Sequence, residues 1–227
     1  MNTGNTNRIR LGALALVLGG VIAVVGEFMR GPLLDPSVNP AGFAQAAASS
    51  NWGAAWTLIL LAATLSIFGT LAIYGYLAGG RADGMAFWGM VLSLAGGALF
   101  LVFTGSFAFA DPVVARLYLQ GNQGAIGAAV AAFYQGPATS ILYPSGLIGT
   151  LGSILLGIAI WRSGTLPRWA GILFAIHTPL LAFASAFSYP LELLGGLALL
   201  ACALWLAPAM LRPAARDGMT AASAARA

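Results

Sequence analysis

The chain has very few charged residues. Only 7% of its 227 residues are charged, whereas soluble domains carry about 25%. Hydrophobic residues make up 59% of the chain, and the mean hydropathy is +0.88. The formal net charge is +4, but nucleic-acid binding requires basic residues clustered on one face, and here they are scattered between apolar segments. The composition excludes a soluble globular fold and predicts an integral membrane protein that binds no nucleic acid.

Cysteine and histidine occur once each, as Cys202 and His177. One cysteine permits no intramolecular disulfide and no cysteine metal cluster. One histidine excludes a haem held by two histidines. The sequence patterns HExxH, CxxC and GxSxG are absent as well. An enzymatic function is therefore unsupported, although not excluded, and we expect neither a metal nor a cofactor.

Long apolar runs dominate the remainder of the chain. A helix needs about 20 residues to cross about 30 Å of hydrocarbon, and six runs qualify as predicted transmembrane helices: 9–29, 52–77, 85–110, 138–161, 170–187 and 190–211. No convincing small-residue cleavage site follows the first run, so we interpret it as a helix and not as a signal peptide. The fold class is therefore all-α: a single transmembrane domain over residues 1–211 and a disordered cytoplasmic tail over 212–227.

The segments between the helices are of two kinds. Residues 78–84 and 162–169 are tight turns, whereas 31–51 and 111–136 are long. The first long segment contains one expected short helix that starts at Asn39 and Pro40. The second contains two, over 112–120 and 125–134, whose apolar residues have the spacing of amphipathic helices. Such helices would cap one end of the bundle and could enclose a ligand pocket, although packing of loops against the bundle is the simpler interpretation.

The turn WRSGTLPRWAG defines the orientation. Its members are Trp161, Arg162, Pro167, Arg168 and Trp169. Arginine in short loops marks the cytoplasmic side, and tryptophan prefers the membrane interface. Six crossings place both termini on the side of this turn, together with eight of the ten arginines. We therefore expect both termini to be cytoplasmic.

The same turn resembles that of the bacterial DUF4386 family. The typical turn in that family has an aromatic residue, Arg-Ser-Gly, a two-residue spacer and Pro-Arg, which corresponds here to Trp161, Arg162, Ser163, Gly164, Pro167 and Arg168. The order of long outer segments and tight inner turns is also similar, so the resemblance extends over residues 8–211. It implies a six-helix, multi-pass protein of a bacterial-type plasma membrane. The function of that family is undetermined, so no catalytic residue carries over.

Four carboxylates are expected at one level, the outer end of the bundle: Glu27, Asp35, Asp111 and Glu192. Charged groups within a membrane are costly and are functional candidates by default. If the bundle brings them together, they could bind a cation or relay a proton. The alternative is that each is solvated or pairs with Arg30 or Arg116. Glu27 and Glu192 are the stronger candidates because apolar sequence surrounds them most closely.

His177 lies about seven residues into its helix and precedes Pro179. A buried, hydrogen-bonded structural histidine is the simpler interpretation. Pro144 interrupts the preceding helix in a similar way, beside small residues that favour close helix packing. The candidate ligand or proton site therefore comprises Glu27, Glu192, Asp111 and His177.

Three functions remain open. A protein that binds a small hydrophobic or amphipathic ligand, or a partner helix, should have a closed apolar cavity beneath the cap, with Glu27 or Glu192 at its edge. A small transporter or ion-coupled permease should have a polar path from the outer carboxylates to His177. A lipid-acting membrane enzyme should have two ionisable residues within hydrogen-bond reach at one depth. The lipid bilayer is the expected partner in each case, and a homo-oligomer stays open.

Overall fold

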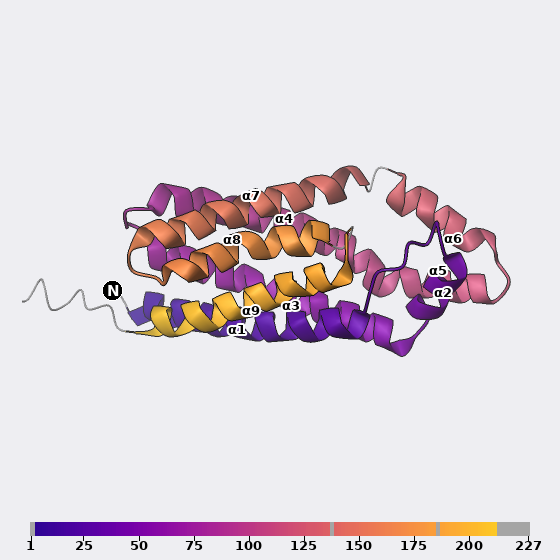
Figure 1. The fold of residues 1–227 in the computed structure, drawn as a ribbon, viewed down its shortest axis with the longest axis horizontal. Coiled ribbons are helices and arrows are strands. Elements are labelled where there is room, and N and C mark those ends of the chain that lie inside the picture. Colours follow the sequence, from indigo (N-terminus) through magenta and orange to yellow (C-terminus); the bar gives the residue numbers. More distant parts are fainter. Residues whose placement is uncertain (1–2, 137–138, 185–186, 213–227) are drawn as a thin grey trace, which may run out of the picture.

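The computed structural model describes residues 3–136, 139–184 and 187–212, and the elements in these ranges are all helical (Figure 1). In chain order they are α1 Thr3–Arg30, α2 Pro40–Ala47, α3 Ser50–Leu77, α4 Asp83–Phe109, α5 Asp111–Leu119, α6 Gly124–Ala129, the π-helical turn η1 Val130–Tyr134, α7 Thr139–Ser163, α8 Arg168–Phe183 and α9 Tyr189–Leu211.

Five helical stretches are long and apolar enough to cross a membrane: Thr6–Arg30, Ser50–Leu77, Asp83–Leu119, Pro144–Ser163 and Tyr189–Leu211. The chain thus has the helices of a multi-pass membrane protein. Helix α8 is apolar but has only 16 residues, which span about 24 Å at the helical rise of about 1.5 Å per residue. Its crossing of the bilayer therefore stays a prediction.

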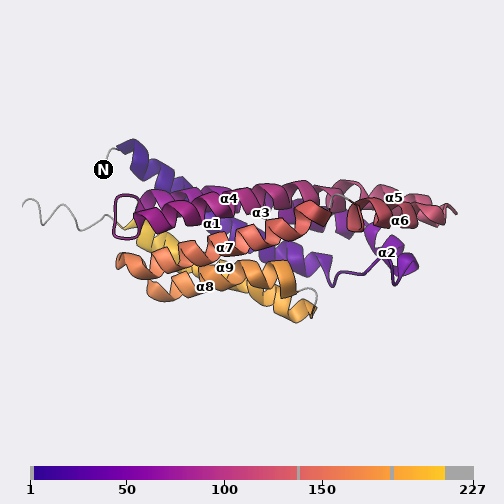
Figure 2. The same ribbon diagram turned by 90° about the horizontal axis from the view of Figure 1, so that it is seen from above.

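The six longest helices form a closed ring. Each packs against the next one in the order α1, α3, α4, α7, α8 and α9, and α9 packs against α1. In Figure 2 the ring is flattened, with α3 and α4 on one side and α8 and α9 on the other. Every neighbouring pair is joined by a connecting segment except α1 and α9, the first and last helices. We call this contact the α1/α9 seam.

The two ends of the ring differ. We call the end that carries α2, α5 and α6 the outer end, and the opposite end, with the turns at 78–82 and 164–167, the inner end (Figure 1). In the inner half, one apolar core gathers side chains from all six helices, and its largest fully buried members are Leu16, Ile73, Leu156, Ile160 and Leu206.

Glycine lets these inner helices approach closely. A Cβ on Gly89 of α4 would lie 2.6 Å from the backbone nitrogen of Leu156 in α7, and Gly157 of α7 meets the backbone oxygen of Gly171 in α8. Contacts between small residues are a common way for helices to associate in membranes, where lipid tails are as apolar as the side chains.

The outer segments extend the molecule along its long axis and project beyond α8 and α9 (Figure 1). Helix α2 begins where the Asn39 side chain accepts a hydrogen bond of 2.9 Å from the Gly42 amide, which satisfies one of the free donors of the first turn. A second apolar core, the outer aromatic cluster, joins α2, α3, α4, α5 and α6 and comprises Phe43, Ala44, Ala47, Trp52, Trp56, Ile59, Ala108, Ala115 and Ile126, with Phe107 packed against it.

Several helix bounds differ from the sequence-based expectation. Helix α1 begins at Thr3 and not at Ile9, and α8 ends at Phe183, four residues before the expected Phe187. Pro144 and Pro179 lie inside continuous helices. The expected start of the fourth transmembrane helix at residue 138 and the expected disordered tail, from residue 213 onward, lie outside the described residues.

Candidate functional site

A buried ionic cluster joins the outer ends of α1 and α9. Glu27 and Arg30 are three residues apart in the last turn of α1 and therefore share a face. Nε and Nη2 of Arg30 lie 3.1 Å and 2.6 Å from Oε2 of Glu27. The same Nη2 forms an ion pair of 2.7 Å with Oε2 of Glu192 in the first turn of α9. We call these three residues the ionic cluster.

The ionic cluster is withdrawn from solvent. The side chains of Arg30, Glu27 and Glu192 are 1%, 10% and 7% exposed. With both carboxylates ionised, one guanidinium serves two of them, so the cluster has a formal charge of −1. Desolvation of such groups costs several kcal/mol per ion, which close pairing only partly offsets. A cluster of this kind is a functional candidate because it is a poor means of stabilising a fold.

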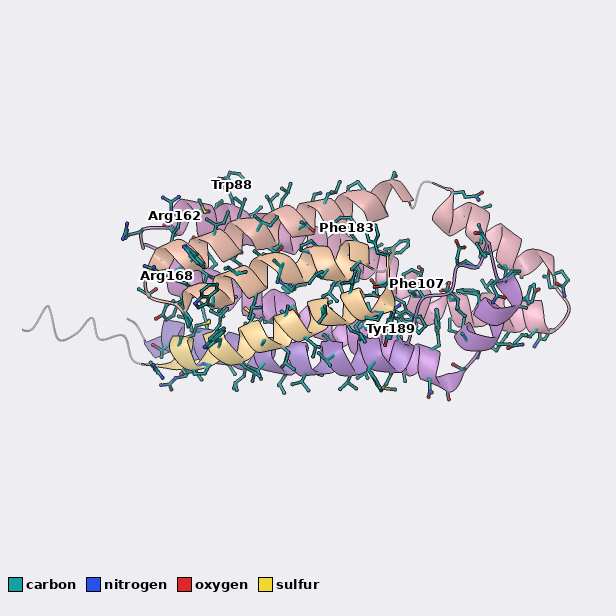
Figure 3. All side chains as sticks on the ribbon, in the orientation of Figure 1. Trp88, Phe107, Arg162, Arg168, Phe183 and Tyr189 are labelled. Carbon is teal, nitrogen blue, oxygen red and sulfur yellow. The ribbon has the colours of Figure 1, made fainter. Side chains whose placement is uncertain are left out.

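Aromatic rings flank Arg30. Its guanidinium carbon lies 5.4 Å from the ring centroid of Trp56 and 6.0 Å from that of Tyr189, within the range of cation–π attraction. The Tyr189 hydroxyl donates a 2.8 Å hydrogen bond to the backbone oxygen of Glu27. Two polar contacts from α9 therefore hold α1 at the outer end of the seam, where Figure 3 labels Tyr189.

Among the described residues, several buried polar atoms without partners lie toward the outer end, although others, such as Oδ1 of Asp83 at the inner end and Oγ of Ser93, lie elsewhere. Within the described ranges, Nη1 of Arg30, Nε1 of Trp56, Oγ1 of Thr104 and Oδ2 of Asp111 are buried and have no hydrogen-bond partner. Trp56 stacks on Phe107, with ring centroids 4.5 Å apart. Buried polar groups without partners are rare in folded proteins, and each one calls for an explanation.

Helical spacing places Thr104 and Asp111 toward α3. Both are buried, at 0% and 4% exposure. They lie four residues before and three residues after Ala108, which packs in the outer aromatic cluster with Trp52 and Trp56. Residues at these spacings share one helix face. Unpartnered atoms from α1, α3, α4 and α5 therefore occupy the same end of the bundle.

His177 makes its contacts within α8. Its Nδ1 lies 2.6 Å from the backbone oxygen of Phe174, and its Nε2 lies 3.0 Å from the hydroxyl of Thr178. The ring also packs on Phe174, with centroids 4.9 Å apart. The structure therefore joins Glu27 and Glu192 through Arg30, whereas both ring nitrogens of His177 have partners in their own helix.

Asp35 is exposed and lies apart from the ionic cluster. Its Oδ1 accepts hydrogen bonds of 2.8 Å from the Ser37 amide and 2.5 Å from the Ser37 hydroxyl. These bonds favour the charged form and hold the pKa of Asp35 below its ordinary value. It caps the turn before α2.

The inner turn is built by local contacts. Trp161 and Trp169 meet edge to face, with centroids 5.8 Å apart. The Ser163 hydroxyl accepts hydrogen bonds from the amides of Thr165 and Leu166, and Gly164 supplies the positive φ of +70° that the reversal needs. Pro167 directly precedes α8, and Arg162 and Arg168 are exposed at the inner end, as Figure 3 shows.

An apolar groove of about 330 Å³ runs along the outside of the α1/α9 seam. Its lining side chains are Val24, Val25, Phe28, Met29, Leu193 and Leu197. Sequence analysis missed this groove because one chain carries no signal that its first and last helices are neighbours. The expected cavity was closed and lay beneath a cap, whereas this groove is open and lies on the flank of the bundle.

The described residues contain no group of three histidine, cysteine or carboxylate side chains placed to hold a metal ion. Comparison with known proteins adds no relative: no family model, no curated protein and no solved structure matches this chain.

Proposed function

We propose that this membrane protein binds an amphipathic molecule taken from the bilayer at the α1/α9 seam. One observation carries the proposal: the apolar groove and the ionic cluster belong to the same turns of the same two helices. Phe28 and Leu193 of the groove directly follow Glu27 and Glu192 of the cluster. The apolar part of the ligand lies in the groove, and its polar head turns inward to the cluster.

The size and position of the groove support this proposal. Small-molecule sites enclose about 300–1,000 Å³, and the groove lies at the lower end of that range. Phe28 is 75% exposed and Leu197 is 47% exposed, on the flank that faces lipid in a membrane. A ligand can therefore enter sideways from the hydrocarbon without crossing an aqueous phase.

The ring closure supports access to the cluster. No connecting segment joins α1 to α9, and at the outer end they are held by the contacts of Glu192 with Arg30 and of Tyr189 with Glu27. The outer ends of the two helices can separate when those contacts break, while the other helix pairs stay joined by the chain. The seam is therefore the natural entrance from the bilayer.

Binding fits the geometry better than the other two functions. The ionic cluster does bring ionisable residues within hydrogen-bond reach at one depth, as a lipid-acting enzyme requires, but Arg30 engages both of its carboxylates, and the unpartnered Asp111 lies on a different helix, away from the groove. A permease needs a polar route across the membrane, but both ring nitrogens of His177 have partners within α8. Neither function uses the groove.

We further propose that the six ring helices all cross a bacterial-type plasma membrane, with both termini in the cytoplasm, as the resemblance to DUF4386 implies. The consecutive order of the ring supports six crossings, and a helix of 16 residues can cross where the bilayer thins locally. Labelling of Asn122→Cys and Thr165→Cys in intact cells with a membrane-impermeant maleimide tests the orientation. Only Asn122→Cys should react. Labelling of Thr165→Cys alone would show that the protein has the opposite orientation.

The ligand site is tested with three amphipaths that share one chain: 1-oleoylglycerol, oleate and oleylamine. Native mass spectrometry of the purified protein should detect at least one of them bound at one copy per chain. Leu197→Trp fills the groove and should weaken that binding at least tenfold. Leu204→Trp places the same side chain on the same face of α9, two turns deeper and outside the groove, and should leave it unchanged. No binding of any probe, or equal weakening by both variants, would refute the site.

A further inference from the structure

We infer that the ligand's head is uncharged and carries hydroxyl or carbonyl oxygen, as in a monoacylglycerol or a long-chain alcohol, because the buried site offers unpartnered N–H donors amid excess carboxylate. The inference rests on the proposed function and names the chemical class of its ligand.

The unpartnered donors require an acceptor. Nη1 of Arg30 and Nε1 of Trp56 have no hydrogen-bond partner among the described residues. Both residues are more than nine-tenths buried, and the guanidinium lies over the indole ring, 5.4 Å from its centroid. Both groups can only donate hydrogen bonds. An ammonium head, which has donors and no acceptor, cannot satisfy either of them.

The charge of the site disfavours an anionic head. Glu27 and Glu192 share one guanidinium, so the cluster has a formal charge of −1 when both carboxylates are ionised, and it offers no surplus of positive charge in any case. Asp111 is also buried at this end of the bundle, and its Oδ2 has no partner in the described part of the chain, so no additional cation is present there to hold an anionic head. Repulsion between like charges is strong where water is excluded. A phosphate or carboxylate head would therefore be repelled, and a neutral oxygen is the acceptor that remains.

A hydroxyl head would satisfy the acceptors as well. Oγ1 of Thr104 and Oδ2 of Asp111 are unpartnered, and both residues lie on the α4 and α5 face that packs in the cluster of Trp56. A hydroxyl group donates one hydrogen bond and accepts others. A hydroxyl that accepts from Arg30 or Trp56 therefore keeps a donor for a buried acceptor of this kind, which a carbonyl lacks.

The head reaches these atoms when the seam opens. Arg30 is buried and does not line the groove, and Tyr189 bridges the outer ends of α1 and α9. A hydroxyl at this place competes with the contact between Arg30 and Glu192. The groove then binds the hydrocarbon chain of the ligand, and the buried N–H donors of Arg30 and Trp56 bind its head group.

The test compares head groups on one chain. We expect 1-oleoylglycerol to bind the full-length protein at pH 8 at least tenfold more tightly than oleate or oleylamine, by native mass spectrometry or calorimetry. Trp56→Phe keeps the ring and removes Nε1, so it should weaken 1-oleoylglycerol about three- to tenfold, the value of one hydrogen bond. Trp88→Phe, at the exposed inner end of α4, should have no effect. Thr104→Val removes a second polar atom at nearly constant shape and serves if Trp56→Phe fails to fold.

The outcomes separate the two proposals. If all three probes bind equally and Leu197→Trp weakens each, the groove site stands and the head-group inference is overturned. Tighter binding of oleate or oleylamine than of 1-oleoylglycerol overturns it too, as does unchanged binding in both Trp56→Phe and Thr104→Val. If no probe binds, both proposals fail.

Discussion

The inner and outer halves of the bundle are packed with different kinds of side chain. In the inner half, glycine and alanine bring helix backbones together around aliphatic side chains, as where Gly89 meets Leu156. At the outer end the space between helices holds the ionic cluster and stacked aromatic rings, whereas buried polar atoms without partners occur in both halves among the described residues. The inner half has the packing of a stable scaffold. The outer end carries groups that a scaffold does not need.

The contrast has a physical basis. A buried ion pair is seldom more stabilising than well-packed apolar residues of the same size. Polar groups are expensive in hydrocarbon, so those that persist there are functional candidates. Under the proposed function, the outer end recognises the ligand and the inner half holds the helices together, so ligand binding should respond to mutations at the outer end and not to mutations in the inner half.

The largest effect on stability should come from Arg30→Ala. The change leaves Glu27 and Glu192 buried without a counter-charge, and loss of one partner from a buried pair costs about 3–5 kcal/mol. Chemical unfolding in detergent should show this loss. Arg10→Ala, at an exposed position near the other end of α1, should be within about 0.5 kcal/mol of the parent. A small effect of Arg30→Ala would mean that the cluster is solvated in the membrane protein.

A smaller effect is expected from Gly89→Ala in the inner half. The new Cβ would lie 2.6 Å from the backbone nitrogen of Leu156, so α4 and α7 must separate, at a cost of about 1–3 kcal/mol. Gly97→Ala is the control on the same helix, because nothing lies within 4 Å of its Cβ. It should be neutral or stabilise by up to about 1 kcal/mol. Equal unfolding midpoints for the two variants would contradict the close contact, and ligand binding should survive both changes.

The smallest effect concerns Asp35, the solvated carboxylate of the outer region. Ser37→Ala removes the hydroxyl hydrogen bond, so the pKa of Asp35 should rise toward its ordinary value in an NMR titration. A lowered pKa in the folded state contributes stability above the unfolded pKa, and this is lost as pH falls through the folded pKa. In the variant, the free energy of unfolding should therefore fall less between neutral and acidic pH than in the parent protein. Ligand binding should be unchanged. An unaltered titration would show that the Ser37 hydroxyl is not the cause.

Helix positions could be predicted because each run carries its own signal. Hydropathy located the long helices, and Asn39 with Pro40 marked the start of α2. The last turn of α8 was predicted wrongly: its apolar run continues to Phe187, but the helix ends at Phe183. Apolar composition does not distinguish a helix from the segment that follows it.

The site was only partly predictable from the sequence. Glu27 and Glu192 could be singled out as carboxylates flanked by apolar residues, and Arg30 was weighed as their partner. Their shared ion pairs with the Arg30 guanidinium depend on the packing of α1 against α9. This packing brings together residues far apart in the chain; Tyr189 and Glu27, for example, are 162 positions apart. The groove depends on the same contact, whereas the approach of Trp56 to Arg30 depends on the packing of α1 against α3. Contacts between helices that are distant in the sequence depend on how the ring of helices closes, and no local sequence pattern predicts this.

The α1/α9 seam is tested most directly by a reversible cross-link. A Cβ on Gly196 would lie 3.9 Å from Cα and 3.6 Å from Cγ2 of Val24, close to the spacing that a disulfide needs. The pair Val24→Cys and Gly196→Cys, in a Cys202→Ala background, can therefore be oxidised to lock the seam. The pair Gly146→Cys and Ala182→Cys is the control, because its Cβ atoms lie 3.5 Å apart between α7 and α8.

The measurement is the binding of 1-oleoylglycerol to each pair before and after oxidation. We predict that the oxidised seam pair loses at least tenfold in affinity and regains it on reduction, while the oxidised control pair binds like its reduced form. Undiminished binding to the oxidised seam pair would contradict the account, because the head of the ligand could not then reach Arg30 and Trp56 between α1 and α9.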